Sequence, residues 1–223
     1  MLSFIRTRLL RLDTVGLTLV FLGGVLLDQT TKVQCQQDMM TWENPDNVHQ
    51  FTGRSIPVFS AGQPTAEPGK TPLYFGFNLT YSRNTGAAFS MLADLRDSIR
   101  VPFFYTVTVV AVIAIFFFFR STPFEHRFTR FGLTMILSGA IGNFIDRLRW
   151  GYVVDFLDAD WNLFGWRHDF AIFNVADVCI NIGVICYIID ILRLHRLEKK
   201  AAAQGNTTEA AGDDSSQSSV AQS

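Results

Sequence analysis

The sequence contains little of what metal centres, disulfide frameworks or redox sites require. It has 3 cysteines and 4 histidines in 223 residues, with no Cys-x-x-Cys pair and no cluster of His and Cys. Cys179 and Cys186 fall on one predicted helix about 10 Å apart along its axis, which is too far for a disulfide. Cys35 lies in a separate segment with no cysteine beside it. These absences argue against structural zinc and redox catalysis.

Charge is also scarce over long stretches. Apolar residues make up 48% of the chain and the mean hydropathy is +0.20, both high for a soluble protein. Residues 101–119 carry no charge and approach the roughly 20 residues that cross a ~30 Å hydrocarbon layer as a helix. Further apolar segments cover residues 14–27, 131–145 and 170–189. One such segment could be a buried soluble helix, but together they predict membrane spans at about 12–28, 100–120, 130–147 and 170–192.

The placement of basic residues predicts the orientation of these spans. Arginine and lysine gather before the first span, between the second and third, and after the fourth. By the positive-inside rule, both chain ends then lie in the cytoplasm. The basic start followed by an apolar run is typical of a signal peptide, but residues 28–32 offer no small-residue cleavage site. The first span is therefore expected to remain in the protein. The basic residues concerned are Arg6, Arg8, Arg11, Arg120, Arg127, Arg130, Arg193, Arg196, Lys199 and Lys200.

The connections predict a β-rich cap on the outer side and a polar tail on the inner side. Residues 33–98 form a long outer connection whose middle, residues 44–70, is rich in Pro, Gly and polar residues and is expected to be a mobile insertion. Residues 73–81 are aromatic and partly alternating, which favours β structure at the membrane surface. Residues 199–223 have almost no apolar side chains and are expected to be disordered. The prediction is a mainly α integral membrane domain over residues 1–198, with four transmembrane helices and an outer (periplasmic) β-rich cap.

Two aspartates within apolar surroundings are the main candidates for chemistry. Asp177 lies roughly 10 Å inside the outer end of the fourth span, where a lone ionised carboxylate is strongly disfavoured. Asp155, also in an apolar run, is its natural partner because a close pair can share one proton. Such a pair can hydrolyse a peptide bond, with one carboxylate accepting a proton from water and the other donating one. The sequence does not assign the acid and the base.

Five blocks spread along the chain carry a resemblance to a known family. They contain small polar and acidic residues at the ends of the predicted spans and in the outer connection. With these blocks, the sequence resembles the lipoprotein signal peptidases, also called signal peptidase II. The blocks occur in the same order as in that family. The blocks are Asp28-Gln29-Thr30-Thr31-Lys32, Asn84-Thr85-Gly86-Ala87-Ala88-Phe89-Ser90, Gly142-Asn143-Phe144-Ile145-Asp146-Arg147, Val153-Val154-Asp155-Phe156 and Phe173-Asn174-Val175-Ala176-Asp177.

The resemblance implies an aspartic endopeptidase of the bacterial inner membrane. It would cut diacylglyceryl-modified prolipoproteins before the lipid-bearing cysteine, using Asp155 and Asp177 and neither metal nor cofactor. Its partners would be these substrates and membrane lipid, not nucleic acid, and its site would face the periplasm. Residue by residue, the match assigns shaping or substrate contact to Asn84, Gly86, Asn143, Arg147 and Asn174, and support to Asp28 and Lys32.

Other interpretations of these residues remain open from the sequence. The asparagines could be contacts between helices, Gly86 could serve a tight turn, and Asp146 could pair with Arg147 to end the third span. A proton-coupled transporter would use Asp28, Asp155 and Asp177 as a charge path, but all three lie toward the outer side and no polar relay continues inward. A non-enzymatic scaffold that binds a partner through its cap is the remaining alternative.

Overall fold

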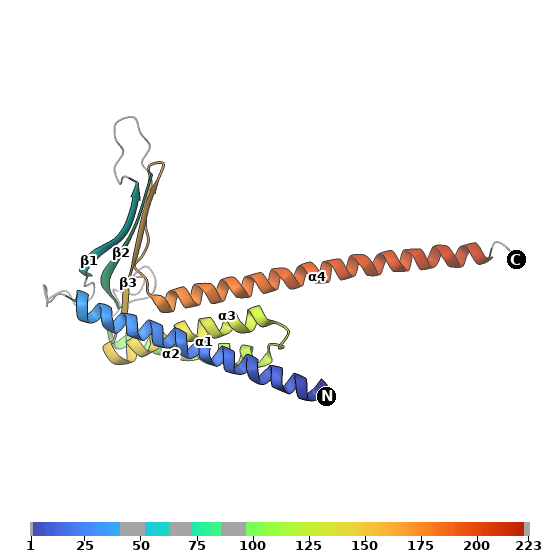
Figure 1. Cartoon of the computed structure of the whole chain (residues 1–223), viewed down its shortest axis with the longest axis horizontal. Coiled ribbons are helices and arrows are strands. Elements are labelled where there is room, and N and C mark those ends of the chain that lie inside the picture. The colour runs from blue at the N-terminus through green and yellow to red at the C-terminus, as the bar shows by residue number, and fades with distance from the viewer. Residues whose placement is uncertain (1, 41–51, 63–72, 86–96, 221–223) are drawn as a thin grey trace.

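The predicted apolar segments form helices that lie side by side. The structure, a computed structural model, describes residues 2–40, 52–62, 73–85 and 97–220. Within these residues the helices are α1 (Leu2–Met39), α2 (Asp97–Ser121), α3 (Arg127–Trp150) and α4 (Val175–Val220) (Figure 1). The stretches long and apolar enough to cross a membrane are Asp13–Met39, Pro102–Ser121, Arg127–Trp150 and Val175–Lys199. This confirms the prediction of a multi-pass membrane protein with four helical spans.

The exposed surface of the helices is apolar, as a bilayer requires. α3 contacts each of the other helices and has many buried residues along its length, whereas most described residues of α2 are not buried. Large apolar side chains on the outside of the helices, such as Leu19, Val110 and Phe117, are exposed. Hydrocarbon solvates such a surface and water does not, so the exposed apolar surface belongs in the membrane.

At one end of α3 and α4, polar groups join the two helices. Asp190 of α4 accepts hydrogen bonds from the backbone nitrogen and the hydroxyl of Thr129 at 3.2 Å and 2.6 Å. His126 lies beside the same carboxylate, with 3.6 Å between its Nδ1 and Asp190 Oδ2. Asp190 thus supplies an acceptor for the first turn of α3, where backbone N–H groups have no helical partner.

At the other end of the helices stands an antiparallel sheet of four strands, in the order β1-β2-β3-β4. The strands are β1 (Thr52–Gly62), β2 (Leu73–Asn84), β3 (Val153–Leu163) and β4 (Trp166–Asp169). The β structure expected at residues 73–81 is confirmed as β2. Part of the segment expected to be a mobile insertion is instead β1, because pairing with β2 gives its backbone and its apolar side chains a partner. The rest of that insertion, residues 44–51 and 63–70, lies outside the described residues.

The sheet is attached so that β3 starts beside the beginning of α4. α3 ends at Gly151, whose left-handed backbone (φ 78°) turns the chain directly into β3. Leu157 of β3 and Phe173 exchange backbone hydrogen bonds of 2.7 Å and 2.9 Å just before α4 begins. On the other side of β3, Phe156 and Tyr81 pack against Met39 at the end of α1. These contacts hold one strand of the cap between two helix ends.

α4 continues well past its membrane span, contrary to the disordered tail expected for residues 199–223. The helix runs to Val220, and residues 221–223 lie outside the described residues. Residues 201–203 are alanines, the best helix formers, and no proline interrupts the segment. Extending an existing helix also avoids the unfavourable nucleation step, which composition alone does not take into account.

Candidate active site

Asp155 lies on β3, with each of its oxygens accepting a hydrogen bond from an asparagine. Its side chain is buried. Asn84 of β2 donates from Nδ2 to Oδ2 at 2.9 Å, and Asn174 donates from Nδ2 to Oδ1 at 2.6 Å. The carboxyl group is therefore fixed in orientation by amides from two different elements.

Asp177 lies in the first turn of α4 and forms a reciprocal cap with Asn174. The backbone nitrogen of Asn174 donates to Asp177 Oδ2 at 3.1 Å, and the backbone nitrogen of Asp177 donates to Asn174 Oδ1 at 3.0 Å. This pattern satisfies N–H groups at the start of a helix. Asn143 of α3 donates to the other oxygen, Oδ1, at 3.0 Å. Asn174 thus contacts both aspartates, one through its side chain and one through its backbone.

The environment of Asp155 disfavours the ionised form of its carboxyl group. Burial raises its pKa from 3.8 to about 7, and the neighbouring charge of Asp177 adds to the shift. The hydrogen bonds from Asn84 and Asn174 act in the opposite direction, because they stabilise the ionised form. The effect of Asp177 on Asp155 places the two predicted aspartates within electrostatic reach of each other.

A buried ion cluster holds Asn143. Lys32 of α1 is fully buried, and its ammonium lies 2.9 Å from Asp28 Oδ2 and 2.8 Å from Asp146 Oδ2. It also donates to Asn143 Oδ1 at 2.9 Å. Because the amide oxygen of Asn143 faces Lys32, its nitrogen is turned to Asp177. The cation of α1 therefore orients a side chain that contacts the site.

The two carboxylates of this cluster, Asp28 and Asp146, also hold the backbone next to Asp177 and Asp155. Asp28 accepts a hydrogen bond at 2.8 Å from the backbone nitrogen of Ala176, next to Asp177. Asp146 accepts one at 3.1 Å from the backbone nitrogen of Val154, next to Asp155. A negative group at a helix start is favoured by the exposed N–H groups there. The cluster thus sets the spacing between the start of α4 and β3.

Arg147 lies at the edge of the site but does not pair with Asp146, as the sequence suggested it might. It donates to the backbone oxygen of Asn143 at 3.1 Å, and its guanidinium lies 5.2 Å from the ring centroid of Phe104. Its guanidinium also interacts electrostatically with Asp146, Asp155 and Asp177, most strongly with Asp146, although no ion pair joins the two neighbours. Asp146 pairs with Lys32 instead, because its side chain points to the interior of the bundle.

The structure brings nearly all of the predicted site residues into one polar cluster. Gly86 is the exception, since it lies outside the described residues. Sequence reasoning overlooked Gln29, which donates to Asp146 Oδ1 at 2.8 Å, and gave Asp146 no role in support. Both residues belong to the blocks that carry the resemblance, and Asp146 follows an apolar pair inside a span. No group of three or more His, Cys, Asp or Glu side chains in the described part of the chain is arranged to hold a metal ion. The clustered residues are Asp28, Lys32, Asn84, Asn143, Arg147, Asp155, Asn174 and Asp177.

Four membrane spans with a buried aspartate, Asp155, and a half-buried one, Asp177, near their ends define a class of integral membrane protein with an aspartic-peptidase type of site. Residues 20–193 match the profile of the family described as signal peptidase (SPase) II. The match covers most of the chain, so the chain belongs to this family of membrane-bound aspartic peptidases. The resemblance inferred from the five blocks is therefore confirmed.

Individual relatives agree with this assignment. The chain is 39% identical over 177 residues to the lipoprotein signal peptidase of Geobacter sulfurreducens, covering 79% of this chain and 91% of the relative. It is 44% identical over 177 residues to that of Geobacter metallireducens, covering 79% and 90%. A solved structure described as a bacterial membrane enzyme superimposes with a TM-score of 0.59 at 32% identity, covering 80% of this chain and 88% of that one.

The buried ion cluster gives a prediction for stability. Lys32→Met leaves two buried carboxylates without their cation, and we expect it to reduce stability by about 3–5 kcal/mol. The measurement is thermal unfolding of the protein in detergent. Arg167→Met removes an exposed cation paired to Asp169 and is the matched control, expected to change stability by less than about 1 kcal/mol. Equal unfolding temperatures for the two variants would contradict the role given to Lys32.

Proposed function

We propose that this chain is a signal peptidase II that hydrolyses lipid-modified prolipoproteins before the modified cysteine, with Asp155 and Asp177 as its catalytic pair. The observation that carries the proposal is the shared asparagine: Asn174 donates to Asp155 at 2.6 Å and to Asp177 at 3.1 Å. A bridge of this kind keeps the two carboxyl groups at one reaction centre, although their ionised forms would repel each other. Such an arrangement is suited to activating water without a metal ion.

In the proposed reaction Asp155 holds the proton at the start and Asp177 is ionised. Asp177 accepts a proton as water attacks the scissile carbonyl carbon, and Asp155 donates its proton toward the carbonyl oxygen. Collapse of the tetrahedral intermediate breaks the C–N bond as the proton on Asp177 passes to the leaving amine. One hydroxyl of the intermediate returns its proton to Asp155, which restores the starting state of the pair. The raised pKa of Asp155, to about 7, supports its assignment as the initial acid. Asn84 and Asn143 keep the two carboxyl groups oriented through these transfers.

The location of the pair supports a substrate that is anchored in the membrane. Asp155 follows the end of the span in α3 by a few residues, and Asp177 lies in the first turn of the span in α4. A cysteine bearing a diacylglyceryl group has its acyl chains in the bilayer and its peptide bond near the surface. We infer that the site faces the periplasm of the bacterial inner membrane and that both chain ends are cytoplasmic, because basic residues gather at the opposite end of the spans.

The proposal extends to the remaining sequence assignments. Gly86 follows Asn84 by two residues, and a small residue there would allow a substrate backbone to approach the end of β2. The peptidase unit is proposed to be residues 1–198, with residues 199–223 as a cytoplasmic extension that is not needed for cleavage. Arg147, held over Phe104, would contribute a fixed positive charge beside the pair.

Replacing either aspartate tests the proposed chemistry. We expect Asp155→Asn and Asp177→Asn each to lower kcat by at least about 10²- to 10⁴-fold, because an amide cannot exchange the proton. The assay is cleavage of a lipidated prolipoprotein peptide by the purified protein. Asp160→Asn, on the same strand as Asp155, is the matched control and should retain activity. Wild-type rates in both aspartate variants, with folding checked by thermal unfolding, would refute the mechanism.

The pKa of Asp155 gives a prediction for pH dependence. Activity that needs protonated Asp155 is present below its pKa and is lost as pH rises through about 7. Asn84→Ala removes a hydrogen bond that stabilises the ionised form, so the alkaline fall in kcat/KM should move to higher pH. Asn78→Ala on the same strand should leave the profile in place. A shift to lower pH in Asn84→Ala, or none at all, would count against Asp155 as the acid.

A further inference from the structure

The two faces of the sheet have opposite chemistry. Successive residues of a strand point to opposite faces, so residues paired across strands share a face. Leu73 pairs with Leu163, which pairs with Trp166, and this row is entirely apolar. The next row, on the other face, is Tyr74, Asn162 and Arg167, and the same alternation continues along the strands. The apolar sheet face comprises, among others, Ile56, Phe59, Leu73, Phe75, Leu163 and Trp166.

The apolar sheet face is open over the half of the sheet that lies away from the helices. Trp166 is 85% exposed, Leu73 59% and Phe59 56%. Single exposed apolar residues are common on proteins, but a face shared by all the strands of a sheet indicates an interaction surface. Within the described residues, the helices in contact with the sheet are α1, which touches β1, β2 and β3, and α3, which touches β3.

The base of the sheet shows which way the apolar face points. Tyr81 and Phe156 pack against the end of α1, and they belong to the opposite face. Leu157 continues the apolar face, and Asp155, two residues before it, points the same way and contacts Asn174 at the start of α4. The apolar sheet face therefore points toward the start of α4. The membrane spans lie on this same side of the sheet.

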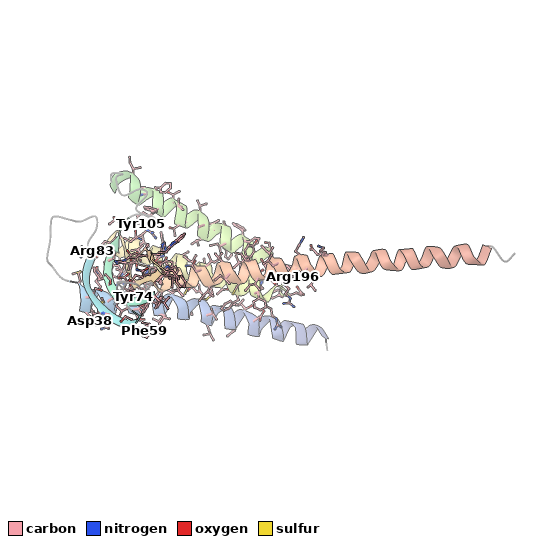
Figure 2. The ribbon with its side chains drawn as sticks, turned by 90° about the horizontal axis from the view of Figure 1, so that it is seen from above. Asp38, Phe59, Tyr74, Arg83, Tyr105 and Arg196 are labelled. Carbon is pink, nitrogen blue, oxygen red and sulfur yellow. The ribbon has the colours of Figure 1, made fainter. Side chains whose placement is uncertain are left out.

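The strands run across the direction of the helices. In Figure 1 the helices lie horizontally and the strands rise steeply from one end of the bundle, reaching past α4. Seen from above, Phe59 and Tyr74 lie at this end, while Arg196 lies partway along α4, away from it (Figure 2). The spans cross the bilayer along the helix direction, so the plane of the membrane lies across the helices and along the strands. The projecting part of the sheet would then extend over the surface of the surrounding membrane, with its apolar face toward the lipid.

We propose that the apolar sheet face rests on the lipid bilayer and anchors the cap there, with the row Leu73, Leu163 and Trp166 in the interfacial layer. Tryptophan is enriched in this layer because its ring is apolar while its N–H can reach polar groups. The opposite face, with Asp158, Asp160 and Asn78, then faces water. Lipid is favoured over protein as the partner of the apolar sheet face. The bilayer that surrounds the spans already lies on this side of the sheet, and a protein partner would have to displace it.

This anchoring has a consequence for catalysis. β3 carries both Asp155 at its base and Leu163 at its far end. Lipid contact at the far end would therefore restrict tilting of the strand relative to the membrane. The height of Asp155 above the bilayer, and with it the position of the bond that can be cut, would depend on the apolar sheet face.

Adjacent residues on opposite faces provide a matched test. Trp166→Cys and Arg167→Cys, each in a Cys186→Ala background, are labelled with an environment-sensitive fluorophore and reconstituted into phosphatidylcholine vesicles. Cys35 and Cys179 are buried, and the parent without an introduced cysteine gives the background labelling. We expect the label at 166 to be blue-shifted and quenched several-fold more by bromine-substituted lipid than the label at 167. Aqueous iodide should show the reverse preference.

Two outcomes would overturn the proposal. Equal iodide quenching at both positions would mean that the face is in water. Protection of position 166 from iodide and from brominated lipid alike would mean that protein, such as a second copy of the chain, covers it. Should Trp166→Cys fail to fold, Leu163→Cys and Asn162→Cys provide the same comparison on β3. None of these residues belongs to the proposed catalytic machinery, so the result is independent of whether Asp155 and Asp177 are catalytic.

Discussion

Two neighbouring carboxylates repel one another when both are ionised, and the arrangement of this protein follows from the need to hold such a pair together. Asn174 does so directly, donating to Asp155 from its side chain and to Asp177 from its backbone. The same residue caps α4 by accepting from the backbone nitrogen of Asp177. The helix start and the paired acids are thus one local structure, and the position of Asp177 is set by the helix that it helps to begin.

The two aspartates come from elements far apart in the chain, and the ion cluster around Lys32 links them. Asp28 binds the backbone at the start of α4, and Asp146 binds the backbone at the start of β3. Lys32 compensates these carboxylates and at the same time orients Asn143 toward Asp177. A buried charge cluster of this kind is a poor source of stability compared with apolar packing, so its value lies in fixing geometry. The cap adds a second constraint, because β3 continues from Asp155 into the face proposed to lie on lipid.

The sequence predicted the features that depend on composition and on short motifs. Continuous apolar segments indicated the spans, and aspartates within such segments identified Asp155 and Asp177 as a pair that the structure brings into contact with one asparagine. Features that depend on packing were less accessible. The pairing of Asp146 with Lys32 rather than with its neighbour Arg147 depends on how α3 is rotated against α1. β1 was missed because its segment is rich in turn-forming residues and becomes a strand only beside β2. The helical extension of α4 was missed because its polar composition outweighed its alanines.

The proposed chemistry requires that Asp155 carries a proton near neutral pH because it is buried beside Asp177. Infrared difference spectroscopy of the reconstituted protein measures this directly through the carbonyl stretch of protonated carboxylic acids. We expect a carboxylic acid band at pH 6 that disappears with an apparent pKa of about 7 and is missing in Asp155→Asn. A band that persists unchanged in Asp155→Asn, or no titrating band in the wild type, would contradict it.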